Sequence, residues 1–269
     1  MLRNITKAQC HIPAAAHRSK GDVMRADQLH ILHEDDDMIV VDKPEGLATI
    51  PERFDREHCL LNYLAESVPY KPYVVHRIDK PVSGAVIFAK NADSHRYLCT
   101  AFEQGRVEKT YLALVHGKPI EEQGTIDYPL RRFGSGRMGV DSRRGKQCRT
   151  EFTVLEECGQ YAHLRVSPRT GRRHQIRVHL YSIGHPIVGD SMYGSREIQE
   201  RFARLMLHAS QISLRMADGH EVSVSSPLPA SYQTLLTQAR EASLDSPGLH
   251  ESRKPDAEAE APADQKRDD

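Results

Sequence analysis

The stretch Val74–Lys90, VVHRIDKPVSGAVIFAK, carries the clearest structural signal in the chain. Its β-branched start and its apolar run at Ala85–Ala89 are typical of strands, and Ser83-Gly84 predicts the turn that leads into the second one. Asp79 stands between them. A carboxylate in this position is held by a sheet while its side chain stays available for chemistry, as a nucleophile or a base.

The residues around Asp79 are basic. His76, Arg77 and Lys80 flank it, and nearby cations favour the charged form of a carboxylate. We therefore expect Asp79 to be ionised. The alternative is an ordinary loop aspartate in a surface salt bridge, with Arg77 as one of its partners.

Six further segments have the apolar or alternating pattern that predicts strands. They are Met38–Asp42, Thr110–Val115, Thr150–Leu155, Tyr161–Val166, Leu207–Leu214 and Glu221–Val224. The third and fourth are separated by five residues that include Gly159, which predicts an antiparallel hairpin. Because strands follow one another instead of alternating with helices, the sequence predicts an α+β domain with a mixed, mostly antiparallel sheet.

Two segments predict helices. Ala92–Gln104 has Asn91 as an N-cap and Gly105 just past its end. The second, Arg172–Ile183, divides into an apolar and a polar face. Its apolar positions are Ile176, Leu180 and Ile183, and its polar positions are His174, Arg177 and Tyr181.

The composition argues against several classes of protein. Among 269 residues, 39% are hydrophobic and 28% charged, and no apolar run approaches the roughly 18 residues that a membrane span needs. The N-terminus lacks the apolar core of a secretory signal. Five scattered cysteines without a CxxC pair and 15 histidines without ligand spacing predict reduced thiols and no metal site. We therefore expect a cytoplasmic protein that contacts no membrane.

The net charge of zero divides unevenly along the chain. Residues 243–269 hold eight acidic and four basic residues, a net −4, so the preceding 242 residues carry +4. We interpret 243–269 as a disordered acidic tail and 1–27 as an N-terminal extension. A single catalytic domain is predicted over 28–242.

Basic residues concentrate in a glycine-rich segment. Between positions 131 and 149 it contains Arg131, Arg132, Arg137, Arg143, Arg144, Lys146 and Arg149, opposed by one aspartate. Guanidinium groups bind phosphate oxygens in pairs, and glycine allows a loop to adapt. The segment is either a phosphate-binding loop or a solvated basic loop.

Several segments together resemble the RluA family of RNA pseudouridine synthases, in the family's order and across about four fifths of the chain. The matching segments are Ile39–Gly46, His76–Asp79, Ser83–Lys90, Lys109–Ala113, Gly171–Leu180, His185–Gly194 and Leu207–Ala209. The resemblance implies an α+β domain with flanking helices and a central active-site cleft. It also implies an enzyme that isomerises uridine in RNA without a metal or other cofactor.

Site residues follow from the resemblance by position. Asp79 matches the nucleophile, which attacks the target nucleotide at ribose C1′ or uracil C6. Tyr111 matches the tyrosine that packs on the base and accepts the carbon-bound proton, although a strand tyrosine can also be plain core. Arg177 matches the basic residue that pairs with the aspartate, although a polar helix face would equally suit a phosphate contact or a surface charge.

The resemblance also implies RNA contacts and flipping of the target base into the pocket. Arg77 is expected to fill the space that the base vacates. The other expected RNA-binding residues are His76, Arg131, Arg132, Arg143, Arg144, Arg172, His174 and Gln175. The partner is rRNA or tRNA, and we expect a monomer.

Three departures from the family pattern bear on substrate preference: Ile78 in place of leucine, and Val82 and Arg173 in place of threonine. Residues 1–27 are too short for the S4-like domain of some members. The main alternative is an RNA-binding or ribosome-assembly factor on the same fold without catalysis. A glycosidase would need a second carboxylate, and a nucleotide-binding enzyme a glycine fingerprint after a strand.

Overall fold

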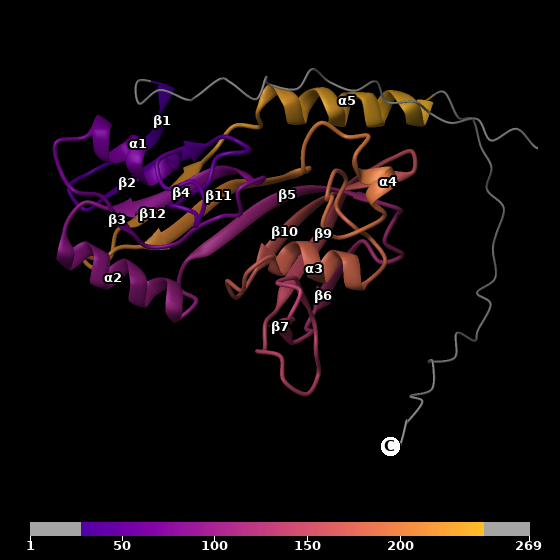
Figure 1. Cartoon of the computed structure of the whole chain (residues 1–269), viewed down its shortest axis with the longest axis horizontal. Helices are drawn as coiled ribbons and strands as arrows, with labels where there is room; N and C mark the ends of the chain where they lie inside the picture. The colour runs from indigo at the N-terminus through magenta and orange to yellow at the C-terminus, as the bar shows by residue number, and fades with distance from the viewer. Residues whose placement is uncertain (1–27, 245–269) are drawn as a thin grey trace, which may run out of the picture.

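A ten-stranded sheet dominates the structure, a computed structural model that describes residues 28–244 (Figure 1). Its strands follow the order β1-β2-β4-β11-β5-β10-β9-β6, with β3 beside β4 and β12 beside β11. Their bounds are β1 His30–Glu34, β2 Met38–Lys43, β3 Tyr73–Val74, β4 Ser83–Ala89, β5 Glu108–His116, β6 Gln123–Ile126, β9 Thr150–Cys158, β10 Tyr161–Pro168, β11 Leu207–Arg215 and β12 Glu221–Ser225. A separate hairpin joins β7 Leu130–Arg132 to β8 Met138–Val140.

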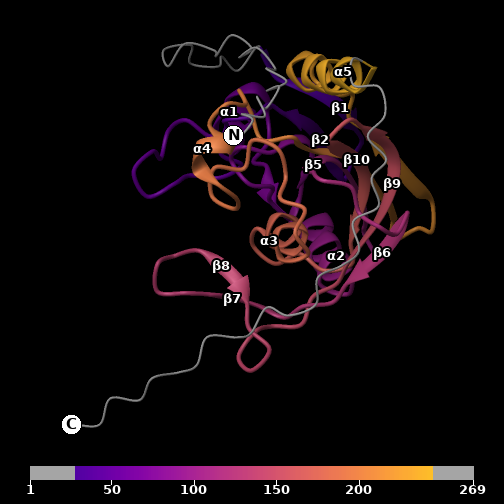
Figure 2. The ribbon, with the colours of Figure 1, turned by 90° about the vertical axis from the view of Figure 1, so that its right-hand side faces the viewer.

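Helices flank both faces of this sheet. They are α1 Leu60–Ser67, α2 Ala92–Glu103, α3 Gln175–Ser182, α4 Arg196–Gln199 and α5 Ala230–Leu244. In Figures 1 and 2, α1 and α5 lie above the sheet, while α2 and α3 lie below it with the β7–β8 hairpin. Every strand pair except β4–β11 is antiparallel. The predicted α+β class is confirmed.

Strands β2 and β4 are buried on both faces, which explains their unbroken apolar runs. Ile39 and Val41 of β2 join the main hydrophobic core, whereas Met38 and Val40 point to a second core beneath α2. The strand β4 alternates in the same way. The α2 helix begins as predicted, because the side chain of Asn91 accepts a hydrogen bond from the Ser94 amide at 2.9 Å.

The hairpin of β9 and β10 is tighter than predicted, with only Gly159 and Gln160 between the strands. Helix α3 is shorter than predicted, because His174 takes a left-handed conformation with φ 54° and the helix begins after it. Its residues Gln175–Leu180 are all buried. Of the predicted polar face, His174 and Arg177 are buried, whereas Tyr181 is exposed.

Three helices, α1, α4 and α5, were not predicted. Helix α5 ends at Leu244, so the first two residues of the predicted tail belong to it. The rest of that tail and the N-terminal extension 1–27 lie outside the described residues. Within residues 28–244, no helix has the length and apolar character needed to cross a membrane.

The contact between β4 and β11 joins the two halves of the sheet directly after the loop that contains Asp79. Ala209 of β11 lies opposite Gly84, whose φ is +118°. A Cβ atom at Gly84 would lie 2.2 Å from the carbonyl oxygen of Ala209. Only glycine combines this backbone conformation with so close an approach of a neighbouring strand.

We therefore expect Gly84→Ala to lower the free energy of unfolding by about 3 kcal/mol or more, from backbone strain and a backbone clash together. Urea unfolding measures the change. Gly134→Ala is the matched control, since a Cβ atom there meets nothing within 4 Å, and a change within about 0.5 kcal/mol is expected. Equal stability of the two variants would contradict this account of the β4–β11 contact.

Candidate active site

Asp79 lies in the loop between β3 and β4, and the backbone on both sides of it is anchored. Before it, the hydroxyl of Thr49 donates to the carbonyl of Ile78 at 2.9 Å and accepts from the amide of Ile78 at 3.3 Å. After it, the fully buried ammonium of Lys43 donates to the carbonyl of Lys80 at 3.1 Å. These contacts hold the loop in place while the Asp79 side chain stays 25% exposed.

The three basic residues next to Asp79 in sequence are not its ion-pair partners. Lys80 pairs with Glu52 at 2.8 Å, and the ring of His76 is directed into the protein. Arg77 is exposed and pairs with no carboxylate among residues 28–244. The side chains that pair with Asp79 come instead from residues more distant in the sequence.

The guanidinium of Arg177 bridges two carboxylates. Its Nε and Nη2 atoms donate to Asp190 at 2.7 and 2.8 Å, and its Nη1 atom donates to Asp79 at 3.3 Å. The side chains of Arg177 and Asp190 are 5% and 0% exposed. Burial opposes the charge of Arg177, but the hydrogen bonds and charges of Asp190 and then Asp79 outweigh it and raise the pKa of the guanidinium. Arg177 therefore presents a permanent positive charge to Asp79.

Asp190 was not singled out from the sequence, although it lies in the matching segment His185–Gly194. Its Oδ1 atom also accepts hydrogen bonds at 3.1 Å from the amides of Met192 and Tyr193. A lone acidic residue in a mostly apolar, glycine-bounded segment was the available signal. The structure shows that Asp190 is buried and paired with Arg177, which the sequence alone did not indicate.

His174 is the second group near Asp79. Its Nε2 atom lies 3.9 Å from Asp79 Oδ1, and its Nδ1 atom shares a hydrogen bond of 2.8 Å with the hydroxyl of Tyr193. Burial lowers the pKa of His174, against the opposing effect of the Asp79 charge. Among residues 28–244, His174 is the one non-glycine residue with positive φ. Strain of this kind is common where a site orients a side chain.

Gln175 is buried and held at both ends of its amide. The Nε2 atom donates to the carbonyl of Arg149 at 2.9 Å and to the hydroxyl of Thr150 at 3.0 Å. The Oε1 atom accepts from the hydroxyl of Thr170 at 2.7 Å and from the amide of Arg172 at 3.0 Å. Gln175 therefore ties the turn before α3 to β9, and the side chain of Arg172 stays exposed at the pocket.

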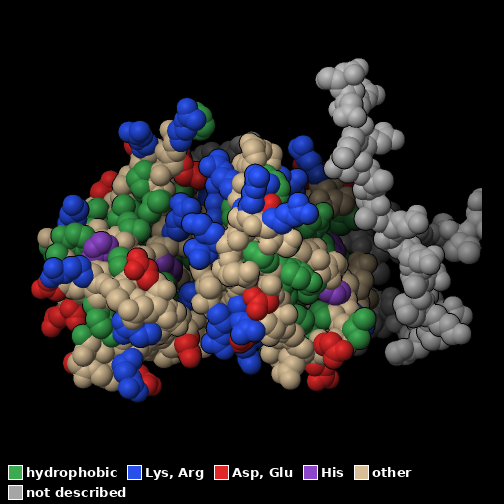
Figure 3. Space-filling model, turned by 90° about the horizontal axis from the view of Figure 1, so that it is seen from below, with side chains coloured by type: hydrophobic (Ala, Val, Ile, Leu, Met, Phe, Trp, Pro, Cys, Tyr) green, Lys and Arg blue, Asp and Glu red, His purple; other side chains and the backbone are tan. Residues whose placement is uncertain are grey.

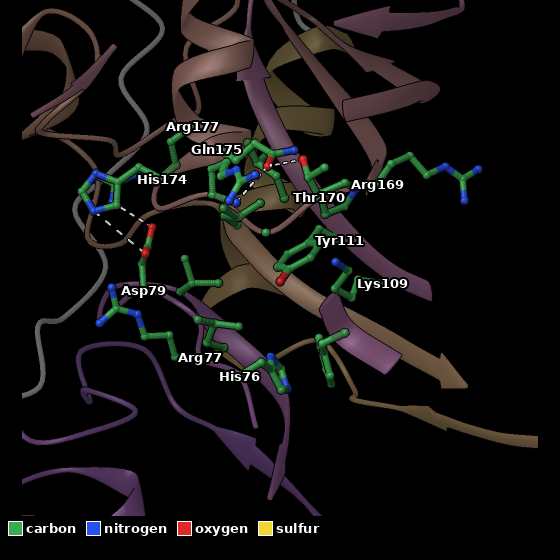
Figure 4. Close-up of a pocket in the computed structure, with 18 of the residues that line it drawn as sticks. His76, Arg77, Asp79, Lys109, Tyr111, Arg169, Thr170, His174, Gln175 and Arg177 are labelled. Atoms are coloured by element: carbon green, nitrogen blue, oxygen red, sulfur yellow. Dashed lines mark hydrogen bonds and ion pairs between the residues drawn. The ribbon is translucent and has the colours of Figure 1, made fainter. Parts of the chain in front are cut away.

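These residues surround a pocket of about 500 Å³ on the face of the sheet that carries α2 and α3 (Figure 4). Tyr111 of β5 lies across the pocket from Asp79 and forms an aromatic wall. Burial, together with the charge of Asp79, raises the pKa of the Tyr111 hydroxyl. The phenol is therefore protonated at neutral pH. The structure brings together Asp79, Tyr111 and Arg177, as the sequence predicted.

His76, predicted as an RNA-binding residue, directs its ring into the protein and not toward the surface. Its ring stacks on Phe102 with centroids 4.5 Å apart, and its Nε2 atom accepts a hydrogen bond from the amide of Ile87 at 3.0 Å. Burial, and next the charge of Lys109, lower the pKa of His76 to about 3. The ring is therefore neutral and links the catalytic loop to β4 and α2.

The predicted RNA-binding arginines of the segment 131–149 lie outside the pocket, on and beside the β7–β8 hairpin. Arg131 pairs with Asp141 at 2.5 Å and lies over the ring of Phe133. The other three, Arg132, Arg143 and Arg144, are exposed. Figure 3 shows this face of the molecule, with Lys and Arg side chains gathered across its middle.

No group of three or more His, Cys, Asp or Glu side chains in the described part of the chain is arranged to hold a metal ion. Inside the pocket the Asp79 carboxylate pairs with Arg177 and faces the aromatic wall, while the second carboxylate of the lining, Glu103, is exposed. A carboxylate that is paired with a cation and faces an aromatic ring can act as a nucleophile or a base on a planar group bound in the pocket.

Comparison with known proteins identifies the class. Residues 37–182 match the model of the RNA pseudouridylate synthase family. An uncharacterized RNA pseudouridine synthase of Zymomonas mobilis is 36% identical over 76% of this chain and 96% of its own length. The ribosomal large subunit pseudouridine synthase D of Pseudomonas aeruginosa is 35% identical over 84% of this chain and 77% of its own length.

A third relative, the tRNA pseudouridine synthase C of Haemophilus ducreyi, is 33% identical over 78% of this chain and 96% of its own length. Among solved structures, human RNA pseudouridylate synthase domain containing 1 superimposes with a TM-score of 0.67 at 29% identity, covering 77% of this chain and 86% of that one. The chain belongs to the RNA pseudouridylate synthase family, in agreement with its resemblance to RluA members. It is therefore an isomerase that acts on uridine in RNA.

The buried pair of Arg177 and Asp190 yields a stability prediction. Arg177→Met leaves Asp190 buried without a cation, so we expect a loss of about 3–5 kcal/mol in the free energy of unfolding. Adding Asp190→Asn removes the unpaired charge and should recover part of the loss, without restoring activity. Urea unfolding and an RNA modification assay measure the two effects. The exposed pair Arg196–Glu200 supplies the control, Arg196→Met, with an expected change within about 0.5 kcal/mol.

The neutral ring of His76 yields a pH prediction. The unfolded chain protonates this histidine near its ordinary pKa of 6.5, whereas the folded protein does so only near pH 3. Between these values the unfolded state binds more protons, so stability decreases as the pH falls, by up to about 1.4 kcal/mol per pH unit from this group. In His76→Gln this contribution is absent. Unfolding free energies measured from pH 6.5 to 4 should fall less steeply than in wild type, and equal slopes would disprove the assignment.

Proposed function

We propose that this chain converts particular uridines of structured rRNA or tRNA to pseudouridine, with Asp79 as the nucleophile. The observation that carries the proposal is the position of the Asp79 carboxylate, at one side of a pocket, paired with Arg177 and facing Tyr111. Carboxylates capture or stabilise an electron-poor sugar in other enzymes that break glycosidic bonds.

Arg177 acts on Asp79 and not on the RNA in this proposal. A guanidinium that is 5% exposed and bonded to two carboxylates has no accessible surface for phosphate. Its positive charge lies beside the Asp79 carboxylate, the group that reacts as a nucleophile in this proposal. Asp190 orients the guanidinium, and His174 lies beside the opposite oxygen of Asp79.

Tyr111 packs on the uracil ring and keeps the detached base in the pocket. A protonated phenol can accept the carbon-bound proton only if it passes its own proton on in the same step. Because its pKa is raised, the Tyr111 phenol is not ionised before the reaction. It therefore passes its own proton on while it accepts the proton from carbon.

RNA binding involves the exposed cations of the same face. A uridine must leave its stack to enter the pocket, and Arg77, exposed beside the nucleophile, is well positioned to occupy the space it leaves. Arg132, Arg143 and Arg144 contact phosphates from the β7–β8 hairpin and its flank. Of the other predicted contacts, Arg172 is exposed at the rim, whereas His174 and Gln175 act by shaping the pocket.

Both rRNA and tRNA are proposed as substrates because relatives of this chain are named for each. Curated relatives include a ribosomal large subunit pseudouridine synthase and a tRNA pseudouridine synthase at similar identity. We further propose that the protein acts in the cytoplasm as a monomer, without a metal or other cofactor. A catalytically silent RNA-binding factor is the alternative, and no feature of the site favours it.

The decisive prediction concerns Asp79. The experiment incubates total rRNA and tRNA from a strain that lacks the gene with purified wild type, with Asp79→Asn or with a control variant. The control is Asp36→Asn, which replaces an exposed aspartate between β1 and β2. Carbodiimide-stop sequencing then maps pseudouridine. We expect wild type and the control to modify one or a few uridines, and Asp79→Asn to modify none, because an amide is not a nucleophile at neutral pH. An active Asp79→Asn enzyme would refute the mechanism, and binding without modification by wild type would favour the silent factor.

A further inference from the structure

A second charged residue, Lys109, shares the wall that Tyr111 forms. The two residues are two positions apart on β5, and side chains of a strand alternate between its faces, so both face the pocket. Figure 4 shows the lysine beside the tyrosine, on the side of the pocket away from Asp79. The ammonium also lies 6.0 Å from the centre of the Phe102 ring.

Lys109 is a half-buried cation of the pocket and, unlike the buried Arg177, it lacks a compensating charge. No carboxylate among residues 28–244 forms an ion pair with it, whereas Arg177 pairs with both Asp79 and Asp190. Its side chain is half-buried, and burial lowers its pKa. The nearby His76 is neutral at physiological pH, and the remaining charged residues of the lining lie at the exposed rim: Arg77, Glu103, Arg169 and Arg172.

The reaction moves a negative charge across this pocket. Before it starts, Asp79, Arg177 and Asp190 together carry one net negative charge, located at Asp79. When Asp79 bonds to C1′ of ribose, the bond between C1′ and N1 of uracil breaks, and its electron pair remains on the uracil and spreads over the two carbonyl oxygens. The charge thus arrives at the side of the pocket where Tyr111 and Lys109 lie, whereas the Arg177 guanidinium is bonded to Asp79 and Asp190.

We propose that Lys109 is a catalytic residue whose ammonium donates a hydrogen bond to a carbonyl oxygen of the detached uracil and stabilises its negative charge. This inference rests on the proposed function. A fixed cation in a site with little water stabilises a developing anion strongly, because it needs no reorganisation when the charge appears. When C5 of the turned base bonds to C1′, the uracil gives up the electron pair and the bond between the sugar and Asp79 breaks, returning the charge to the carboxylate.

Two other roles for Lys109 predict different effects on RNA binding and on the steps of the reaction. A lysine that binds an RNA phosphate would strengthen RNA binding and its dependence on salt. A lysine that accepts the proton from C5 would act only in the last step, after the new bond has formed. The test must therefore separate binding, detachment of the base and loss of the proton.

Two versions of one RNA stem-loop provide this separation, one with uridine and one with 5-fluorouridine at the target position. Fluorine withdraws electrons and makes uracil a better leaving group. It also replaces the hydrogen that must be lost, so the reaction of this RNA ends once the carbon bond has formed. Single-turnover rates follow from chromatography of the digested nucleosides for wild type, Lys109→Met, Lys109→Arg and the control Lys118→Met, a surface lysine paired with Glu157 beyond the far end of β5.

We expect Lys109→Met to slow conversion of the uridine RNA roughly 100-fold and that of the fluorinated RNA roughly 10-fold, with RNA affinity unchanged. Lys109→Arg should regain part of the rate, and Lys118→Met should match wild type. Thermal unfolding checks that each variant is folded, and an unfolded Lys109→Met is replaced by Lys109→Gln.

Several outcomes would overturn the inference. A full rate on the fluorinated RNA with a loss on uridine assigns Lys109 to proton removal. Equal losses on both RNAs, or a weaker affinity with a smaller salt dependence, indicate a structural or phosphate-binding role. If wild type converts neither RNA, the proposed function fails, whereas a wild-type rate in Lys109→Met defeats only this inference.

Discussion

The three hydrogen bonds from Arg177 to Asp190 and Asp79 are the constraint on which the site depends. A guanidinium and a carboxylate that are both almost fully buried lose their hydration, and only close pairing offsets that cost. The loop before β4, the helix α3 and the segment after it must therefore meet at one point. The close approach of β4 to β11 at Gly84 brings the first of these segments to the others.

Around this pair the pocket has two walls of different chemistry. One wall holds a carboxylate between a permanent cation and a neutral histidine, and the other presents an aromatic ring and a lysine without a carboxylate partner in the described part of the chain. Such a division suits a reaction in which negative charge leaves a nucleophile, resides on a planar base and returns. Both walls belong to the central strands and the segments next to them, so their spacing is set by the sheet and not by mobile loops.

Much of the fold was predictable because its strongest local signals agree with the packing. The apolar runs of β2 and β4 and the Asn91 cap of α2 are read directly from the chain. Helix α5 was missed although Tyr232, Leu235, Leu236 and Ala239 have helical spacing and are buried, because small and polar residues separate them. The start of α3 was misplaced because a left-handed histidine is a strained conformation that no local propensity favours.

By itself the sequence determined the family and, by position in its motifs, selected Asp79, Tyr111 and Arg177 as the candidate catalytic residues. Only the tertiary structure decided what these residues contact. Two basic neighbours of Asp79 in sequence, His76 and Lys80, contact other residues, and an arginine 98 positions away pairs with Asp79 instead. Asp190 and Lys109 likewise gain their significance from burial and from the residues that face them. The physical reason is that electrostatic interactions depend on distance and on exclusion of water, and folding sets both between segments that are far apart in the chain.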